Sequence, residues 1–332
     1  MLLGTTADAQ PPWIVKWYQE GVLWHNNNGI KIIPNQDWTV VSIQDNGNWA
    51  LVPHCVGERL LAEIDSLGWI GSCCEGCIEG PSPSAYVGSV YGPTWNRIDI
   101  FTSYGIAITG ITPEYPWFLG CAPELHEGIA SDHHAFQLHG STLFVGGHDD
   151  VCPARIWKVQ YSFMPDATNS CWCVPNEPVT LELYGDTLLS VAFPTVTKLD
   201  TASGNLGGSF ELFTGTPVGN GWTWLSADSL YWISQFGGSD LHLGKYLMGS
   251  GPVWEVALPL AGLPVSLHDD GMGRLWTAVG NTIVWINTQD GTYETNTFGL
   301  TVDAMDVYNG SIAITGTTDG VTSYIMRAHL TP

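Results

Sequence analysis

The sequence predicts an all-β protein, and three observations support this class. The chain of 332 residues contains 39 Gly, 20 Pro and 16 Trp, whereas charged residues make up only 13% of it, so strong helix formers are scarce. Short apolar segments alternate with polar turns along the chain. These paired segments also recur at a similar spacing. Because 44% of the residues are hydrophobic, the chain can build a large core, which argues against disorder.

The paired segments are typical of β-hairpins, in which an apolar strand, a turn containing Gly, Asn or Asp, and a second strand follow one another. The predicted strand pairs are 39–43 with 49–52, 98–101 with 106–110, 135–138 with 142–146, 179–183 with 187–191, 222–225 with 230–234, 264–267 with 274–278, and 304–307 with 311–316. Third and fourth strands are predicted at 156–161, 196–200, 254–258, 282–287, 292–298 and 324–328. Each unit is therefore expected to form one small antiparallel sheet.

The hairpin turns are spaced like the blades of a β-propeller. Successive turns lie 35 to 58 residues apart, counted from Gly47, Gly105, Gly140, Gly185, Asp228, Gly273 and Gly310. A blade repeats about every 40 to 50 residues, and radial stacking buries both faces of each sheet. We expect one β-propeller domain over residues 1–332 with seven blades. Six or eight blades and a pair of β-sandwiches are the alternatives.

The two ends of the chain are expected to meet in one blade. The last hairpin unit stops at its third strand, near Ala328, and so lacks an outer strand. The segment 13–17, of sequence WIVKW, has the composition of a strand and can supply it. The sequence thus predicts a propeller closed by an N-terminal strand.

Three long segments interrupt the repeat, at about 55–91, 111–134 and 151–177. They are rich in Pro, Cys and aromatic residues, a composition that favours loops over regular strands. We expect inserted loops there that contact other protein subunits of an assembly.

The sixth unit carries a family resemblance. The segment 269–276, of sequence DDGMGRLW, followed by GNTIVWIN at 280–287, resembles the D-x-x-G-x-[LI]-W…G-x-[IV] repeat of propellers of the streptogramin-lyase and two-component-sensor type. Residues 45–49 are similar and shorter. The resemblance implies the propeller fold and no particular activity. From the residues themselves, the first role expected of Asp269 and Asp270 is to form the turn through hydrogen bonds to the backbone.

The charge of the chain excludes one class of partner. With 10 Lys and Arg against 32 Asp and Glu, the net charge is −22, so the chain has no basic patch with which to bind nucleic acid sequence-specifically. No apolar run reaches the about 18 residues that a membrane-spanning helix needs, so no membrane span is expected.

The segment 124–150 is the richest in side chains that can ligate a metal. It contains half of the ten histidines and several carboxylates, and its candidate ligands are His126, His133, His134, His148, Asp149 and Asp150. No spacing typical of a metal site is present, so solvated loops are the preferred interpretation and no cofactor is expected.

The eight cysteines favour disulfides or plain thiols over a zinc site. The pair Cys74 and Cys77 has zinc-like spacing, but no second pair matches it. The candidates for disulfides are Cys55, Cys73, Cys74, Cys77, Cys121, Cys152, Cys171 and Cys173, and the pairing does not follow from the sequence.

The tryptophans divide into two groups. Those on predicted strands are expected to pack between blades, and they include Trp49, Trp232, Trp276 and Trp285. Three aromatic residues expected in loops, Tyr115, Trp117 and Trp172, are instead candidates for contacts with a protein partner or a surface glycan.

These observations favour binding over catalysis, because the chain has neither a nucleophile elbow nor a phosphate-binding loop. In fold and charge it resembles propeller components of phage tails and tail nozzles, where like-charge repulsion lets DNA slide through an acidic lumen. The expected role is an assembly or host-recognition component of a virion, assembled in the host cytoplasm. The alternatives are a secreted propeller enzyme, either a lyase or a glycan hydrolase, and a carbohydrate-binding lectin.

Overall fold

The computed structural model describes residues 13–21, 25–32, 39–44, 59–64, 66–72, 83–91, 95–102, 135–139, 142–147, 152–160, 169–217, 221–236, 240–308, 310–317 and 323–331, with side chains at 13–15 and over most positions from 135 onward. All regular structure in these ranges is β-strand, as predicted. No helix in this part of the chain is long and apolar enough to cross a membrane.

Five four-stranded antiparallel sheets make up most of the described chain. The first contains β8 (Ala135–His139), β9 (Thr142–Gly147), β10 (Arg155–Gln160) and β11 (Asn169–Cys173), and the second contains β12 (Thr180–Tyr184), β13 (Thr187–Ala192), β14 (Thr195–Asp200) and β15 (Leu206–Glu211). The third contains β16 (Trp222–Ser226), β17 (Ser229–Gln235), β18 (Leu241–Leu247) and β19 (Gly251–Leu258), and the fourth contains β20 (His268–Asp269), β21 (Arg274–Val279), β22 (Thr282–Asn287) and β23 (Tyr293–Thr297). The fifth contains β24 (Thr301–Tyr308), β25 (Ser311–Thr317) and β26 (Ser323–Leu330), joined by β1 (Trp13–Gly21).

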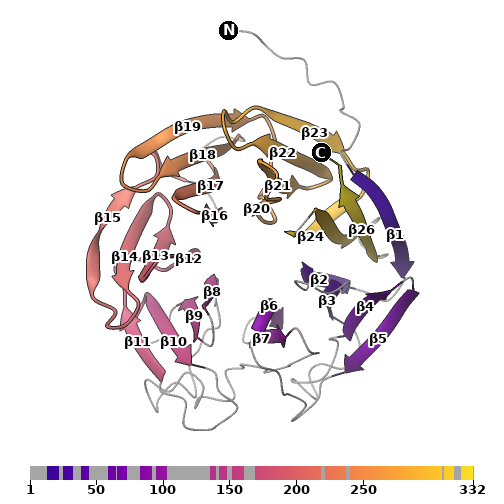
Figure 1. The fold of residues 1–332 in the computed structure, drawn as a ribbon, viewed down its shortest axis with the longest axis horizontal. Helices are drawn as coiled ribbons and strands as arrows, with labels where there is room; N and C mark the ends of the chain where they lie inside the picture. The colour runs from indigo at the N-terminus through magenta and orange to yellow at the C-terminus, as the bar shows by residue number, and fades with distance from the viewer. Residues whose placement is uncertain are drawn as a thin grey trace.

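Three two-stranded sheets complete the described strands. They pair β2 (His25–Ile32) with β3 (Thr39–Gln44), β4 (Arg59–Ile64) with β5 (Ser66–Ser72), and β6 (Pro83–Tyr91) with β7 (Trp95–Thr102). Strand β3 lies beside β4, and β2 lies beside both β6 and β24. Figure 1 shows the sheets arranged side by side around a common centre, with the first strand of each four-stranded sheet nearest to it.

Most of the predicted strands that fall within the described residues are present, and three need correction. The segments 39–43 and 98–101, expected as the first strands of their hairpins, pair with the preceding strands β2 and β6. The segment 264–267 was expected as a first strand, but the regular pairing with β21 covers only His268 and Asp269, preceded by an isolated bridge between Pro264 and Val279. Pro264 has no N–H group with which to extend the ladder. The predicted strands 49–52 and 106–110 lie outside the described residues.

Two of the three segments expected as inserted loops also contain strands. Strands β4, β5 and β6 lie within 55–91, and β10 and β11 lie within 151–177. The loop expectation was therefore wrong for β4, β5, β6 and β11, whose backbone groups are satisfied by antiparallel pairing, whereas β10 is the strand predicted at 156–161. The segment 111–134 lies outside the described residues.

The same backbone hydrogen bond recurs in four consecutive sheets. In each, the N–H at the end of the third strand donates to a carbonyl in the turn after the first strand. The pairs are Thr201 with Asp186 (3.1 Å), Met248 with Asp228 (2.8 Å), Thr288 with Gly273 (2.9 Å), and Leu330 with Gly310 (2.8 Å). This recurrence shows that the four sheets are copies of one structural unit despite their dissimilar sequences.

Apolar cores lie between neighbouring sheets. One contains side chains of β10, β12 and β13, a second joins β13 to β17, a third joins β17 to β21, and a fourth joins β21 to β25. Trp232, Trp276 and Trp285 are buried in these cores, as predicted from their strand positions. Trp49 lies outside the described residues.

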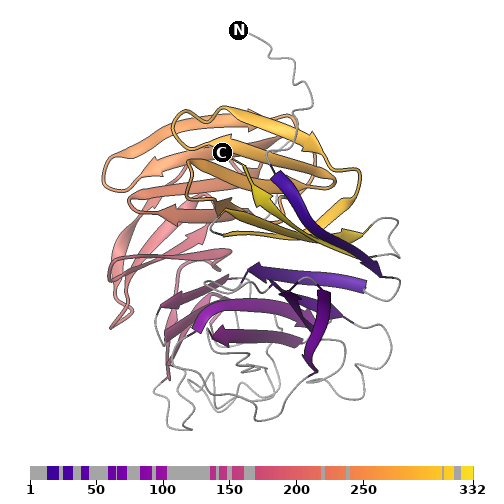
Figure 2. The same ribbon diagram turned by 45° about the vertical axis from the view of Figure 1, so that its right-hand side comes forward.

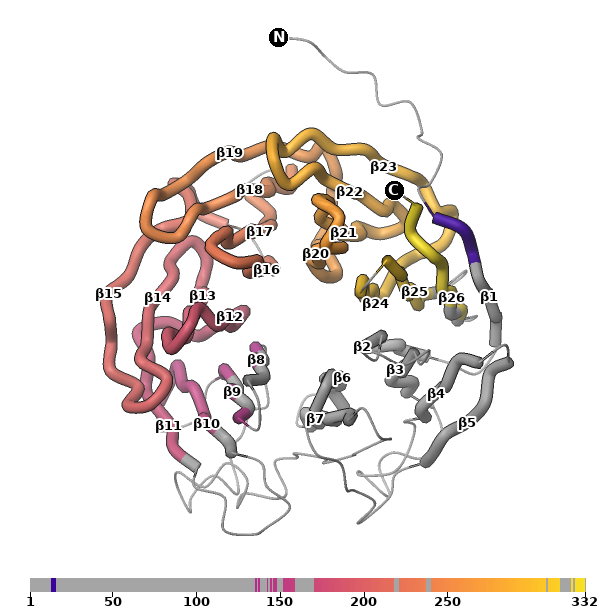
Figure 3. The backbone as a smooth tube through the Cα atoms, viewed as in Figure 1, coloured from indigo at the N-terminus to yellow at the C-terminus, as the bar shows by residue number. Residues whose placement is uncertain are grey.

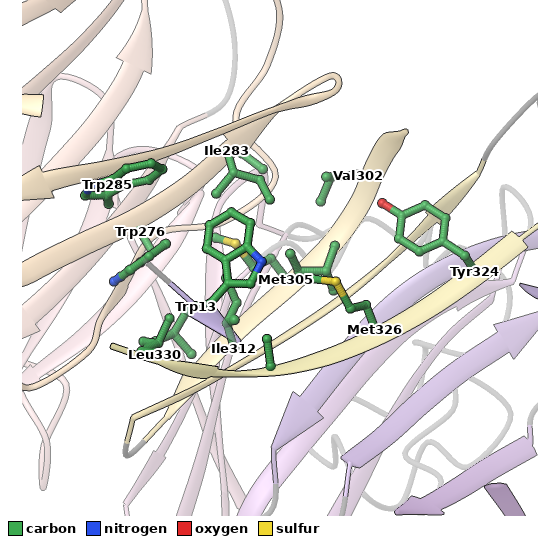
Figure 4. Packing of buried hydrophobic residues seen from close by; sticks show 14 residues of the cluster. Trp13, Trp276, Ile283, Trp285, Val302, Met305, Ile312, Tyr324, Met326 and Leu330 are labelled. Carbon is green, nitrogen blue, oxygen red and sulfur yellow. The ribbon is translucent and has the colours of Figure 1, made fainter. Parts of the chain in front are cut away.

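Strand β1 is the outer strand of the sheet formed by the last three strands of the chain. It pairs antiparallel with β26, from Trp13 opposite Leu330 to Gly21 opposite Ser323, and Figure 2 shows the indigo strand beside the yellow ones. The Trp13 ring lies 6.0 Å from the ring of Trp276 and 6.1 Å from that of Trp285. Figure 4 shows Trp13 among the side chains of this core, so β1 also packs against the preceding sheet.

We predict that Trp13→Ala lowers the free energy of unfolding by about 3–5 kcal/mol, because it removes a buried indole and leaves a cavity at the junction of two sheets. Ile14→Ala is the matched control on the same strand. Because Ile14 is 66% exposed, its loss should be less than about 0.5 kcal/mol. Denaturant unfolding followed by circular dichroism measures both. Equal losses for the two variants would contradict the packing role of Trp13.

Candidate functional site

The innermost strands offer the surface closest to the centre of the molecule. Figure 3 shows β12, β16, β20 and β24 nearest the centre, each beside the next. Polar side chains gather on both sides of β16, which has Thr223 directed toward β12 and Trp224 directed toward β20. These two groups are the candidate site in the described part of the chain.

The first group joins β12 to β16 through Glu182. The Thr223 hydroxyl donates to Glu182 Oε1 at 2.8 Å, and the Thr180 and Thr223 hydroxyl oxygens are 2.6 Å apart. Burial raises the pKa of the Glu182 carboxyl to about 7, although hydrogen bonds from Thr223 and from the Leu225 backbone act in the opposite direction. The carboxyl is therefore held within hydrogen-bonding contacts between two sheets.

The second group joins β20 to β24 through His268. Its Nε2 lies 2.8 Å from the Met305 carbonyl oxygen, and its Nδ1 lies 3.5 Å from Asp306 Oδ1. The Ser266 hydroxyl donates to the same carbonyl at 3.3 Å, and the Trp224 ring packs edge-on against the imidazole at 5.5 Å. Since Ser266 is buried and both side chains meet at one backbone carbonyl, this arrangement binds two sheets together and presents no exposed nucleophile.

Asp270 organises the turn that carries the family resemblance. Its Oδ1 accepts from the N–H groups of Met272 (2.7 Å) and Arg274 (3.1 Å), and its Oδ2 accepts from Arg274 Nε (2.7 Å) and Trp276 Nε1 (3.0 Å). Asp269 accepts one bond, from the Gly271 N–H at 2.8 Å. The expectation that both aspartates form the turn is confirmed, and Asp270 also connects it to a buried tryptophan.

A lysine and a tryptophan of one sheet hold a turn of the next sheet at two junctions. Lys158 Nζ donates to the Thr201 carbonyl at 2.7 Å, and the ring of Trp172 lies against Gly204. The same arrangement recurs two junctions further along, where Lys245 Nζ donates to the Thr288 carbonyl at 3.3 Å and the ring of Trp254 lies against Gly291.

Both glycines have the backbone conformation that their turns require. Gly204 and Gly291 have φ of 73° and 75°, a region that favours glycine, and a Cβ at either position would collide with the adjacent indole. We call each set of lysine, tryptophan and glycine a junction clamp.

Trp172 is therefore placed differently from the prediction. It lies on β11, not in a loop, and its ring is 6.2 Å from that of Phe144. Its indole packs between sheets because strand alternation directs it toward the next sheet, which leaves less of it available to a partner. Tyr115 and Trp117, the other predicted contact residues, lie outside the described residues.

The predicted cysteine and metal residues are only partly covered. Cys152 and Cys173 form a disulfide that joins the segment before β10 to β11, with Cα atoms 5.9 Å apart. The candidate ligands His126, His133, His134, His148, Asp149 and Asp150 lie outside the described residues, as do Cys55, Cys73, Cys74, Cys77 and Cys121. In the described ranges, no group of three or more His, Cys, Asp or Glu side chains is placed to hold a metal ion.

Comparison with known proteins shows the fold class. No family model and no curated protein matches the chain. Among solved structures, the WD40 domain of Neurospora crassa Pan2 is similar with a TM-score of 0.59 at 10% identity, covering 93% of this chain and 92% of that one.

Two further structures agree. BBS1N in complex with ARL6DN is similar with a TM-score of 0.58 at 10% identity, covering 97% of this chain and 98% of that one. BamB from Moraxella catarrhalis is similar with a TM-score of 0.51 at 13% identity, covering 92% of this chain and 83% of that one. These likenesses, together with the repeated four-stranded antiparallel sheets, show a β-propeller repeat fold. At these identities they show the fold alone.

We predict that Asp270→Ala lowers the free energy of unfolding by about 3–5 kcal/mol, because it leaves the partly buried Arg274 and the Trp276 indole N–H without their acceptor. The neighbouring Asp269→Ala removes a single hydrogen bond, which is exposed to solvent, and should lower the free energy of unfolding by about 1 kcal/mol or less. Denaturant unfolding of both variants measures the difference. A smaller loss for Asp270 than for Asp269 would contradict this description of the turn.

The stability of the protein should also depend on the protonation of Glu182. Between the ordinary glutamate value of 4.5 and a pKa of about 7, the folded state holds a proton that the unfolded state has released, so the free energy of unfolding falls as the pH rises. Because part of Glu182 stays exposed, we expect a fall of about 2 kcal/mol from this group.

Glu182→Gln should remove this fall and keep the acceptor for Thr223. Denaturant unfolding at pH 5 and pH 8 measures the effect, with Glu211→Gln on the exposed outer strand β15 as control. The Glu182 idea fails if both variants keep the pH dependence of the unchanged protein.

Proposed function

We propose that this chain is a non-enzymatic, protein-binding β-propeller of seven blades, closed by β1. The pairing of β1 with β26 supports the closure, because it places the two ends of the described chain in one sheet. The arrangement of β2 to β7 supports the blade number, because β3 lies beside β4 and the β6–β7 pair follows as a separate sheet.

The observation that carries the binding role is the use of the polar groups on the innermost strands. Glu182, His268 and Asp306 each contact the neighbouring strand, and the Ser266 hydroxyl is buried against a carbonyl. Polar groups that are engaged in contacts between neighbouring strands stabilise the fold and are not available to a substrate. The described inner surface thus supports a binding protein better than an enzyme.

A structural neighbour supports a protein partner. BBS1N, which is similar over nearly its whole length, was solved in complex with ARL6DN. A propeller offers a rigid and broad surface for such contacts, since each sheet is held by neighbours on both faces. The predicted contact residues Tyr115 and Trp117 extend this proposal to the segment 111–134.

The finer proposal is an assembly component of a virion, within or attached to a phage tail. It rests on the net charge of −22, which repels nucleic acid passing close to the protein while protein subunits bind elsewhere on it. The role is an analogy drawn from the propeller fold and the acidic charge together.

The test is to purify virus particles from the source that carries the gene, and to measure the chain in them by quantitative mass spectrometry. We expect the chain to sediment with the particles at a constant ratio to the capsid protein, and its gene to lie beside genes for capsid, portal and tail proteins. Absence from the particles, with metal-dependent cleavage of a polysaccharide by the pure protein, would overturn the proposal.

A further inference from the structure

The turns between the first and second strands of four consecutive sheets, together with the strand residues that enter them, carry two kinds of exposed side chain. The apolar ones are Tyr184 (39% exposed), Met272 (45%) and Tyr308 (38%). The acidic ones are Asp186 and Asp228, which are exposed, and Asp269, which is partly exposed. We call these six residues the turn face.

The turn face lies on one side of the molecule. In each of the four sheets, the recurring hydrogen bond joins the first turn to the end of the third strand, so both lie at the same end of the sheet. Consecutive sheets are also joined at this end, by Lys245 Nζ to the Thr288 carbonyl and by Arg274 Nη1 to the Thr331 carbonyl at 2.9 Å. The turns therefore follow one another along an arc.

Two of the apolar side chains of the turn face, Tyr184 and Tyr308, end strands β12 and β24, and the third, Met272, lies in the turn after β20. Turns normally carry Gly, Asn, Asp or Ser, and a single exposed apolar residue on a surface needs no explanation. Here an exposed large apolar residue recurs in or beside the first turn in three of the four sheets, at Tyr184, Met272 and Tyr308. Tyr184 and Tyr308 occupy the same position, the last residue of the first strand, and Met272 lies within its turn, so exposed apolar area recurs at this end of the molecule.

The charge at this end is negative, because Asp186, Asp228, Asp269 and the exposed Asp200 outnumber the two lysines there, which keep their charge although they donate to carbonyls. Lys158 and Lys245 donate to carbonyls of the next sheet, and Arg274 is paired with Asp270 at 2.7 Å. The carboxylates of Asp186 and Asp228 face solvent. Tyrosine rings also attract ammonium and guanidinium groups through their faces. The turn face thus combines apolar contact area with attraction for cations.

We propose that the turn face binds a segment of a partner protein that carries Lys or Arg beside apolar side chains. The proposal deepens the protein-binding function above and rests on it. A second copy of this chain is a poor occupant, since its own charge of −22 repels the carboxylates of the face. The partner segment must be basic, whereas this chain is acidic.

The proposal is tested by calorimetric titration of the full chain with three synthetic peptides. One contains lysine, leucine and glycine in equal parts, the second has glutamate in place of lysine, and the third has serine in place of leucine. We expect only the first to bind, with an affinity that falls as salt rises because exposed charges are screened.

Two sets of variants locate the binding. The double variant Tyr184→Ser with Tyr308→Ser should lower the affinity for the first peptide by about tenfold or more. The double variant Asp186→Asn with Asp228→Asn should reduce the salt dependence of that affinity. The matched controls are Leu206→Ser and Val253→Ser, which are 57% and 52% exposed but lie on the outer strands β15 and β19. They should bind as the unchanged chain does, and circular dichroism confirms that every variant is folded.

Each other result overturns the proposal. These results are no binding of the first peptide, equal binding of the glutamate peptide, or equal weakening by the outer-strand controls. Self-association of the chain that the tyrosine variants abolish would assign the face to a second copy instead. If the chain is present in purified particles and the peptide does not bind, the turn face is wrong while the proposed function stands.

Discussion

The contact of Trp13 with Trp276 and Trp285 is the interaction on which the described architecture depends most. Each sheet has two apolar faces, and burying both requires a neighbour on each side. The last three strands of the chain also lack an outer strand of their own, and β1 supplies it from the other end of the chain. Trp13 then extends past its own sheet into the core of the preceding one, so one residue joins strand pairing to sheet packing.

The remaining junctions solve the same problem with different chemistry. Two use a clamp of lysine, tryptophan and glycine, and a third uses Glu182 with two threonine hydroxyls, while the junction of Trp13 also has His268 against the Met305 carbonyl. Polar groups at these places cost desolvation free energy, which is visible in the raised pKa of Glu182. They supply donors and acceptors across the junctions, and they engage Glu182, His268 and Asp306 on the innermost strands whose side chains the structure describes.

Much of the strand pattern could be predicted from the sequence, because hairpins are local. Strand β1 was predicted because the last unit ended at its third strand, and the pairing with β26 confirms it. The polar junctions were not predicted. Thr180 and Thr223 meet although they are 43 residues apart, and only the stacking of sheets brings them together. Trp172 was assigned to a loop because its flanking cysteines suggested an irregular segment. Strands β4 to β6 were missed because the segment 55–91 as a whole was assigned to an inserted loop on its Pro, Cys and aromatic content.

Hydrogen exchange of the backbone amides in β1 and β26 tests the central claim most directly. If the N-terminal strand is a permanent part of the last sheet, the paired amides between Trp13 and Gly21 should exchange as slowly as those of β25, the strand on the other side of β26. Fast exchange throughout β1, with β26 behaving as an exposed edge beside a protected β25, would contradict the account.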